Sequence, residues 1–200
     1  MKLKLFYPLK PWRVNQPFGN VSPMYTNLGL KGHNGLDLYA VDSQPIRAAH
    51  DGIVTFCGED GSGGLGVVIR TTETFDYYSP KTGKLQPSFF KTIYWHLKPN
   101  TFKVKATQVV KTGDILALAD NTGISTGTHL HFGCKPVYKG EKDWEWWNAE
   151  QDNGYRGSID PMPFFSGIYA EQVVKYRGLQ VSIISILEKL IELIKKKHAS

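Results

Sequence analysis

Two histidines that follow a glycine-rich turn are the residues best placed to do chemistry. The segment STGTHLHFG puts His129 and His131 two residues apart. Side chains at that spacing on a β-strand point to one face, so both imidazoles would line a surface while Leu130 and Phe132 face the other way. Because imidazole binds metal ions and exchanges protons near neutral pH, the pair predicts a metal site or acid–base catalysis.

A second segment, GHNGLDL, offers a nitrogen and an oxygen ligand close together. His33 and Asp37 are four residues apart, and on a helix they would share a face. The flanking residues Gly32 and Gly35 favour a turn that runs into a strand instead. In either conformation His33 and Asp37 lie within reach of one metal ion.

The third histidine segment is TIYWHL, residues 92–97. Strand alternation predicts that Tyr94 and His96 share one face of a strand, with the residues between and beside them on the other. Tyr94 could donate a hydrogen bond to a reacting oxygen, but we expect it to pack within the strand.

These segments together predict a zinc site. Zinc accepts histidine nitrogen and carboxylate oxygen, and a catalytic zinc site keeps about three protein ligands plus water. Any one histidine alone is more often structural, but three polar-faced histidine segments and an aspartate form a stronger pattern. His50 and His198 lack such a context, and we do not expect them in the site.

The elements that must position these residues are short strands. Apolar runs occur at 36–40, 52–57, 66–71, 92–97, 114–119 and 129–133, and turn residues separate them. With 20 glycines and 11 prolines in 200 residues, the chain is typical of a mainly β fold with an antiparallel sheet, sandwich or barrel. Residues 1–32 read as an irregular lead-in, and residues 72–91 as a long hairpin loop or insertion.

The end of the chain differs in kind. Apolar residues recur there at helical spacing, which predicts an amphipathic helix over 180–198. The residues that carry this pattern are Ile183, Ile184, Leu187, Leu190, Ile191 and Ile194. The helix could pack on the domain, form a homo-oligomer through residues 181–197, or lie on a membrane surface.

The charge of the chain narrows the choice of partner. The formal net charge is +6, which favours polyanions such as nucleic acid, anionic lipid or an acidic cell wall. No basic stripe interleaved with aromatic residues stands out, so we do not expect a nucleic-acid partner. No segment reaches the ~18 apolar residues of a membrane span. Cys57 and Cys134 are expected to be small buried residues rather than a disulfide framework.

The three histidine segments, in this order, resemble those of the lysostaphin-type zinc metalloendopeptidases, which act on bacterial cell walls. The resemblance covers roughly residues 30–165 and includes PIRAAHDGIVTFCG, GVVIRT, VVKTGDILALADNTG and IDPMPFF. It implies an antiparallel, hybrid-barrel-like peptidase core with long loops, which we place at 33–170. Two positions depart from the family pattern: Thr128 replaces the usual proline, and Gly133 stands where a glutamate is common.

The resemblance also implies a role for each polar residue. His33, Asp37 and His131 correspond to the ligands of one zinc ion per chain. His129 corresponds to a catalytic base and His96 to the other catalytic histidine, and the roles of these two could be exchanged.

The implied function is hydrolysis of peptide cross-links or stem peptides of peptidoglycan. Glycyl-glycine and D-alanyl-diaminopimelate bonds are both open as substrates. The start MKLKLFYPLKPW lacks the apolar run of a secretory signal. We therefore expect the protein to reach the extracellular or periplasmic wall by lysis, virion delivery or specialised secretion.

Two other functions compete with this one. A non-catalytic zinc-binding protein of the same fold could act as an activator through its C-terminal helix. A lipoyl or biotinyl carrier domain would share the barrel motifs, but the chain has no Met-Lys-Met or Asp-Lys-Ala triplet for modification.

Overall fold

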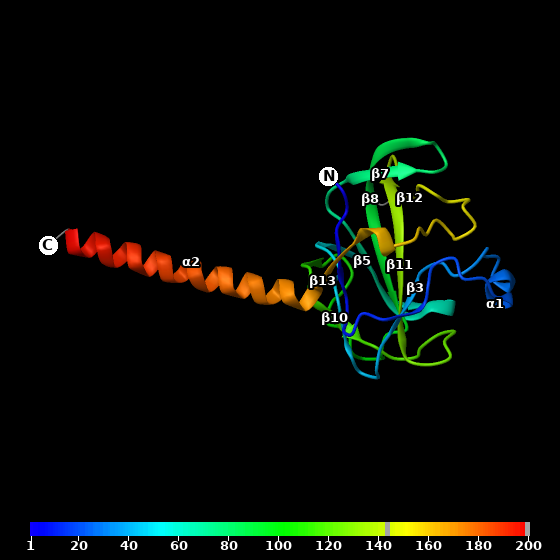
Figure 1. Ribbon diagram of the computed structural model, residues 1–200, viewed down its shortest axis with the longest axis horizontal. Coiled ribbons are helices and arrows are strands. Elements are labelled where there is room, and N and C mark those ends of the chain that lie inside the picture. Colours follow the sequence, from blue (N-terminus) through cyan, green and yellow to red (C-terminus); the bar gives the residue numbers. More distant parts are fainter. Residues whose placement is uncertain (143–144, 199–200) are drawn as a thin grey trace.

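A nine-stranded antiparallel sheet forms the body of the protein (Figure 1). The computed structural model describes residues 1–142 and 145–198, with the backbone alone for 192–198. In spatial order the main strands are β2 (Val14–Gln16), β3 (Leu36–Tyr39), β11 (His129–Lys139), β8 (Lys84–Trp95), β6 (Gly64–Arg70), β5 (Gly52–Asp60) and β9 (Val109–Val110). Two more strands complete the sheet: β7 (Phe75–Ser79) pairs with β8, and β12 (Trp146–Asn148) pairs with β11.

Two smaller strand pairs accompany this sheet. One joins β4 (Pro45–Arg47) to β10 (Ile115–Leu118) in antiparallel fashion, and the other joins β1 (Leu5–Tyr7) to β13 (Phe165–Tyr169) in parallel. The short helical elements are α1 (Pro23–Asn27), η1 (Gly61–Gly63) and η2 (Met162–Phe164). The prediction of a mainly β, antiparallel fold is confirmed, and all six apolar runs form strands.

The hydrophobic core lies against one face of the sheet because the central strands alternate. Leu36 and Leu38 on β3, and Leu130 and Phe132 on β11, are fully buried in one contiguous cluster. The residues between them point to the opposite face. That opposite face carries the polar side chains of the candidate site.

Residues 1–32 are more ordered than the expected irregular lead-in. They contain β1, β2 and α1, and Leu3, Leu5 and Leu9 are buried in the core. Each of the two strands has three residues, and Pro8 and Pro11 lie between them. Runs this short give too little periodicity to reveal a strand from sequence.

Residues 72–91 form a β-hairpin arm rather than a loop. β7 pairs along its whole length with β8, and β8 then continues into the centre of the sheet. The polar residues that argued against a strand find a buried partner, because the hydroxyl groups of Tyr77 and Ser79 donate to Glu150 Oε1 at 3.1 Å and 2.6 Å. A satisfied hydrogen bond removes most of the cost of burying these groups.

The C-terminal helix, α2 (Ala170–His198), begins ten residues before the expected position 180. Its first two turns dock on the domain. Glu171 contacts Lys10, and Arg177 donates to the carbonyl of Thr112 and to Asp51 Oδ1, each at 3.0 Å.

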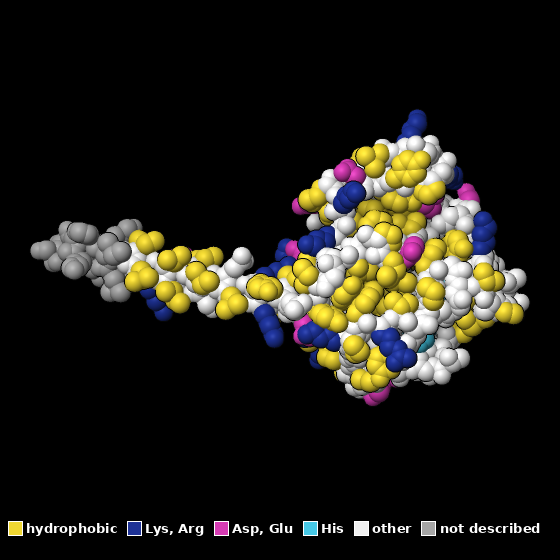
Figure 2. Space-filling model, viewed as in Figure 1, with side chains coloured by type: hydrophobic (Ala, Val, Ile, Leu, Met, Phe, Trp, Pro, Cys, Tyr) yellow, Lys and Arg dark blue, Asp and Glu magenta, His cyan; other side chains and the backbone are white. Residues whose placement is uncertain are grey.

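Beyond Gly178 the helix leaves the domain and extends away from it (Figures 1 and 2). From Leu179 to Ile191, the exposed large apolar side chains are 49% (Leu190) to 67% (Val181) exposed. Packing on the domain therefore does not account for the apolar stripe of residues 181–191. Among the described residues, no helix combines the length and the apolar character needed to cross a membrane.

Candidate functional site

β11 carries both histidines of the HLH segment to the open face of the sheet. His131 pairs with Asp37 on β3 and with Trp95 on β8, so an imidazole, a carboxylate and an indole ring meet at one level of the sheet. Leu130, between the two histidines, is fully buried on the other side. The predicted division of this strand into a polar and an apolar face is confirmed.

His33, Asp37 and His131 converge on one point. The Nε2 atom of His33 lies 3.1 Å from Asp37 Oδ1 and 3.0 Å from His131 Nδ1, and the Asp37 and His131 atoms are 3.0 Å apart. In a tetrahedral zinc site with bonds of ~2.0–2.1 Å, ligand atoms stand ~3.3 Å apart. The triangle therefore has the dimensions of a zinc ligand set.

The hydrogen bond on the far side of His33 strengthens this fit. Its Nδ1–H donates to the carbonyl of Pro17 at 3.1 Å, which leaves a lone pair on Nε2. That lone pair faces the Asp37 carboxylate, which is itself an acceptor. Two acceptors this close repel each other unless a cation or a proton lies between them, so the donor set suits a metal ion.

Gly35 makes room for the third ligand. A Cβ atom built on Gly35 would lie 2.7 Å from the His131 ring and 2.7 Å from the carbonyl of Phe132. The sequence marks Gly35 as a turn residue, but the structure shows a second requirement, close approach of the imidazole. Side-chain atoms do not tolerate such contacts, so only glycine fits here.

His129 and His96 stand beside the ligands with matching orientations. Each donates its Nδ1–H to a backbone carbonyl at 2.7 Å, His129 to Gly127 and His96 to Thr122. Their ring centroids are 4.6 Å apart. Both rings are thus held with the Nε2 lone pair free to face a substrate, and His129 Nε2 lies 3.4 Å from Asp37 Oδ1.

The predicted faces of the TIYWHL strand are wrong. Trp95 and Ile93 line the open face with His96, whereas Tyr94 is fully buried and accepts a hydrogen bond from the Ala49 amide at 2.9 Å. The strand ends at Trp95, and His96 adopts a φ of 64°, in the left-handed region. This backbone reversal breaks the alternation and turns His96 toward the ligands. Tyr94 packs in the core, as expected.

Proximity shifts the pKa values of the polar residues. Burial acts to raise the pKa of Asp37, but the close approach of the His129, His131 and His33 rings holds it well below its ordinary range. Burial lowers the pKa of His96 to about 4, and its histidine neighbours add to the shift. Burial acts to lower the pKa of His129 too, but the Asp37 carboxylate holds it above its ordinary value. His96 is therefore neutral at neutral pH.

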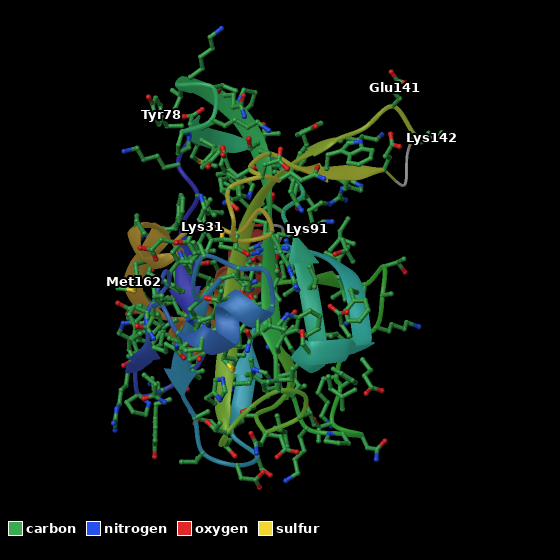
Figure 3. All side chains as sticks on the ribbon, turned by 90° about the vertical axis from the view of Figure 1, so that its right-hand side faces the viewer. Lys31, Tyr78, Lys91, Glu141, Lys142 and Met162 are labelled. Carbon is green, nitrogen blue, oxygen red and sulfur yellow. The ribbon has the colours of Figure 1, made fainter. Side chains whose placement is uncertain are left out.

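The five residues lie in an open groove of about 450 Å³. α1 forms one wall, and the tip of the β5–β6 hairpin and the loop at 123–126 form the others. In Figure 3, which views this side of the molecule, α1 lies in front of the sheet. The open shape and the mixed polar and apolar lining suit an extended chain as a ligand.

Tyr25 is a site residue that the sequence does not reveal. Its ring stacks on His33 with centroids 5.3 Å apart, and burial together with the nearby Asp37 raises its pKa to about 12. It comes from α1, inside the segment expected to be irregular. No spacing pattern links it to the histidines, so only the fold shows that they meet.

The other histidines and the cysteines lie elsewhere, as expected for the residues that the structure describes. His50 is buried, and its ring contacts Thr92 Oγ1 at 2.8 Å. The side chain of His198 lies outside the described residues. Cys57 and Cys134 are both free thiols; Cys134 is buried as expected, whereas Cys57 is partly exposed.

Comparison with known families gives a match over most of the domain. The model of peptidase family M23 matches residues 31–143, more than half of the chain and all five site residues. Among curated proteins, DD-carboxypeptidase/endopeptidase Mpg of Neisseria meningitidis is 32% identical over 129 residues, which is 64% of this chain and 25% of that protein.

Two further matches have names that state a bond or a metal. Glycyl-glycine endopeptidase ALE-1 of Staphylococcus capitis is 31% identical over 107 residues, 52% of this chain and 25% of that protein. A zinc-containing peptidase from Vibrio cholerae has a solved structure that covers 74% of this chain and 40% of that chain, with 25% identity and a TM-score of 0.52. The matched part of the chain thus spans about a quarter of the length of the curated relatives.

Proposed function

Because the chain belongs to peptidase family M23, we propose that it is a zinc endopeptidase that hydrolyses peptide cross-links or stem peptides of bacterial peptidoglycan. The observation that carries this proposal is the triangle of His33, Asp37 and His131, with two further histidines beside it. The names of its relatives, a DD-carboxypeptidase/endopeptidase and a glycyl-glycine endopeptidase, support the substrate class.

The residues that would hold one zinc ion are His33 through Nε2, Asp37 through Oδ1 and His131 through Nδ1. When bound there, zinc supplies a Lewis acid that lowers the pKa of water to ~7 and polarises a peptide carbonyl. The Pro17 carbonyl fixes the tautomer of His33, and Gly35 leaves space for the ring of His131. These contacts pre-organise the side chains that would bind the metal.

The two remaining histidines would move protons. We assign His129 as the general base, because its Nδ1–H is held by Gly127 and its Nε2 lone pair faces the ligand triangle. His96 would stabilise the negative charge that develops on the carbonyl oxygen. The Thr122 carbonyl holds the His96 ring in the same tautomer. The alternative is therefore that His96 is the base and His129 stabilises the oxyanion, and alanine variants of the two residues distinguish these assignments.

The partner and place of action follow from the substrate. The protein would act on the cell wall, on its extracellular or periplasmic side, and the +6 charge suits an anionic polymer. We also propose self-association through residues 181–197, because the exposed apolar residues of α2 recur three and four positions apart on one stripe. Lysis, virion delivery and specialised secretion remain predictions for the route to the wall.

The test is to incubate the purified protein with isolated peptidoglycans of several cross-link chemistries, with and without a zinc chelator. Mass spectrometry should find new peptide termini that disappear when zinc is removed, and these termini would identify the bond. Intact muropeptides from every wall, with zinc still bound, would contradict the enzyme and favour the activator function.

A further inference from the structure

A row of cationic residues crosses the sheet beside the proposed zinc ligands, and it begins at the groove with Lys135. Lys135 follows His131 by four residues on β11, so the two share a face with Cα atoms about 13 Å apart. Gly133, between them on that face, carries no side chain that would separate them. Lys91 on β8 pairs with Lys135, and Arg70 on β6 pairs with Lys91. Three cations therefore stand on neighbouring strands.

Lys135 and Lys91 have no acidic partner among the residues that the structure describes. In residues 1–142 and 145–198, neither ammonium group forms an ion pair or a hydrogen bond. Burial lowers the pKa of Lys135 to about 8, and repulsion from Lys91 and Arg156 adds to the shift, while Asp60 opposes it. Asp60 is exposed and lines the same groove, and among the described residues it forms no ion pair with Lys135. An anion at this point would relieve the repulsion.

The segment that runs alongside β11 at Lys135 carries a hydroxyl group without a partner among the described residues. The amide of Ile159 donates to the carbonyl of Cys134 at 2.9 Å, which lays the 158–159 segment alongside β11. Ser158 is 1% exposed, and its Oγ has no hydrogen-bond partner among the described residues. A buried hydroxyl without a partner is costly, so this donor favours a ligand that accepts a hydrogen bond.

Arg156 supplies a second cation on the wall of the same cavity. Its guanidinium donates to the carbonyl of Leu28 at 2.8 Å, which fixes the side chain beside α1. Lys135, Arg156 and Ser158 all line the groove that contains the zinc ligands. Lys91 and Arg70 lie on the neighbouring strands and are not among the residues that line the groove. Figure 3 shows Lys91 near the middle of the face, and the Arg70 guanidinium stacks 3.5 Å from the Trp146 ring centroid.

We propose that Lys135, Arg156 and Ser158 form a carboxylate-binding subsite that selects wall peptides with a free carboxylate near the bond that is cut. An extended peptide advances ~3.3–3.6 Å per residue, so this carboxylate would lie about two to four residues from that bond. The inference rests on the proposed function and names its substrate class. Glycine bridges carry no side-chain carboxylate, whereas stem peptides with glutamate or diaminopimelate do, so the subsite favours stem peptides.

Peptide binding tests the subsite independently of turnover. Three synthetic stem peptides would be titrated into the zinc-loaded His129→Ala protein by calorimetry: one unmodified, one with its side-chain carboxylate amidated, and one with its C-terminal carboxylate amidated. We expect side-chain amidation to raise the Kd about 10- to 100-fold, the usual effect of losing a charged hydrogen-bond partner. A loss caused by C-terminal amidation instead would support the subsite and identify the peptide end as its ligand.

Substitutions then locate the effect. Lys135→Gln should raise the Kd of the unmodified peptide to that of the amidated one, after which amidation changes little. Lys84→Gln, an exposed lysine on the β7–β8 arm, removes the same charge and should leave all three Kd values unchanged. Lys91→Gln, outside the cavity, should weaken binding in the same direction by a smaller factor. Thermal unfolding and zinc content confirm that each variant is folded.

Binding that ignores amidation, or Lys135→Gln weakening all three peptides equally, would overturn the subsite. Either result holds whether or not the protein cuts the wall, because binding is measured without turnover. A protein that cuts peptidoglycan without discriminating between the peptides keeps the proposed function and loses the subsite. A protein that binds the carboxylate and cuts nothing loses only the function.

Discussion

At the scale of single residues, a metal ligand and a proton carrier differ in what their substitution removes. His131→Ala should abolish zinc binding and activity together, because it deletes one corner of the ligand triangle. His129→Ala should retain most of the zinc and lower kcat by about 10²- to 10⁴-fold, the usual contribution of a general base. Zinc content by mass spectrometry and turnover on a wall peptide measure the two effects.

His96→Ala is the matched variant for the assignment of the base. It should also retain zinc and lower kcat, since His96 bonds the backbone of Thr122 and lies outside the ligand triangle. Near-normal turnover of His129→Ala, combined with a large loss in His96→Ala, would exchange the two roles.

Gly35 allows a sharper test of how the ligands are placed. Gly35→Ala should lower zinc affinity by about 10- to 100-fold, because the new methyl group would displace the His131 ring. Gly127→Ala is the control: it lies beside His129, but a Cβ there meets nothing within 4 Å. A competition titration with a zinc indicator compares them, and equal zinc affinity in both variants would contradict this account.

The sequence reveals those residues of the site whose chemistry and spacing are distinctive. His33, Asp37, His96, His129 and His131 stand out as polar groups in apolar segments, and the structure brings all five together. The contribution of Gly35, Tyr25 and Lys135 depends on contacts across strands or elements that are distant in sequence. Such contacts leave no periodic signal, so the fold is needed to find them.

At the scale of elements, alternation predicts a strand well but not where it ends. The two faces of β11 follow from HLHF, whereas the faces around Tyr94 do not, because His96 adopts a left-handed φ. The polar residues of the β7–β8 arm favour a loop when only the sequence is considered, because polar side chains are rarely buried without a partner. Their partner, Glu150, lies 71 residues from Ser79, too far along the chain to be inferred.

Buried His50 joins the turn before β5 to β8 and should make stability depend on pH. Its ring bonds Thr92 on β8, and burial lowers its pKa below the ordinary value of 6.5. Both states are neutral above that value. As the pH falls through it, the unfolded chain takes up a proton that the folded protein resists, so stability is lost toward acid.

We therefore expect the free energy of unfolding to fall by up to about 1.4 kcal/mol per pH unit below pH ~6.5 through this residue alone. His50→Gln, which can still bond Thr92, should be less stable at neutral pH but show a shallower fall. Urea unfolding at several pH values measures both curves. Parallel curves would show that another group is responsible.

At the scale of the whole molecule, removing the end of α2 should separate self-association from catalysis. Removing residues 179–200 keeps the docked turns, with Glu171 and Arg177 in place, and deletes the exposed stripe. We expect the truncated protein to be monomeric by light scattering, with unchanged kcat on a soluble peptide. The double variant Ile184→Ser, Leu187→Ser of the 200-residue chain should behave in the same way. A monomeric unsubstituted 200-residue chain would contradict self-association.

The position of α2 has a consequence for a solid substrate. α2 leaves the domain on the side away from α1, which forms a wall of the groove (Figure 1). With 29 residues it is about 44 Å long, so helices bundled along their stripes would hold several grooves facing outward around a stalk. Each groove would bind a different strand of the wall. A copy that dissociates would stay tethered by its neighbours and rebind before it diffuses away. Avidity would therefore keep the assembly on the polymer even if each groove bound weakly.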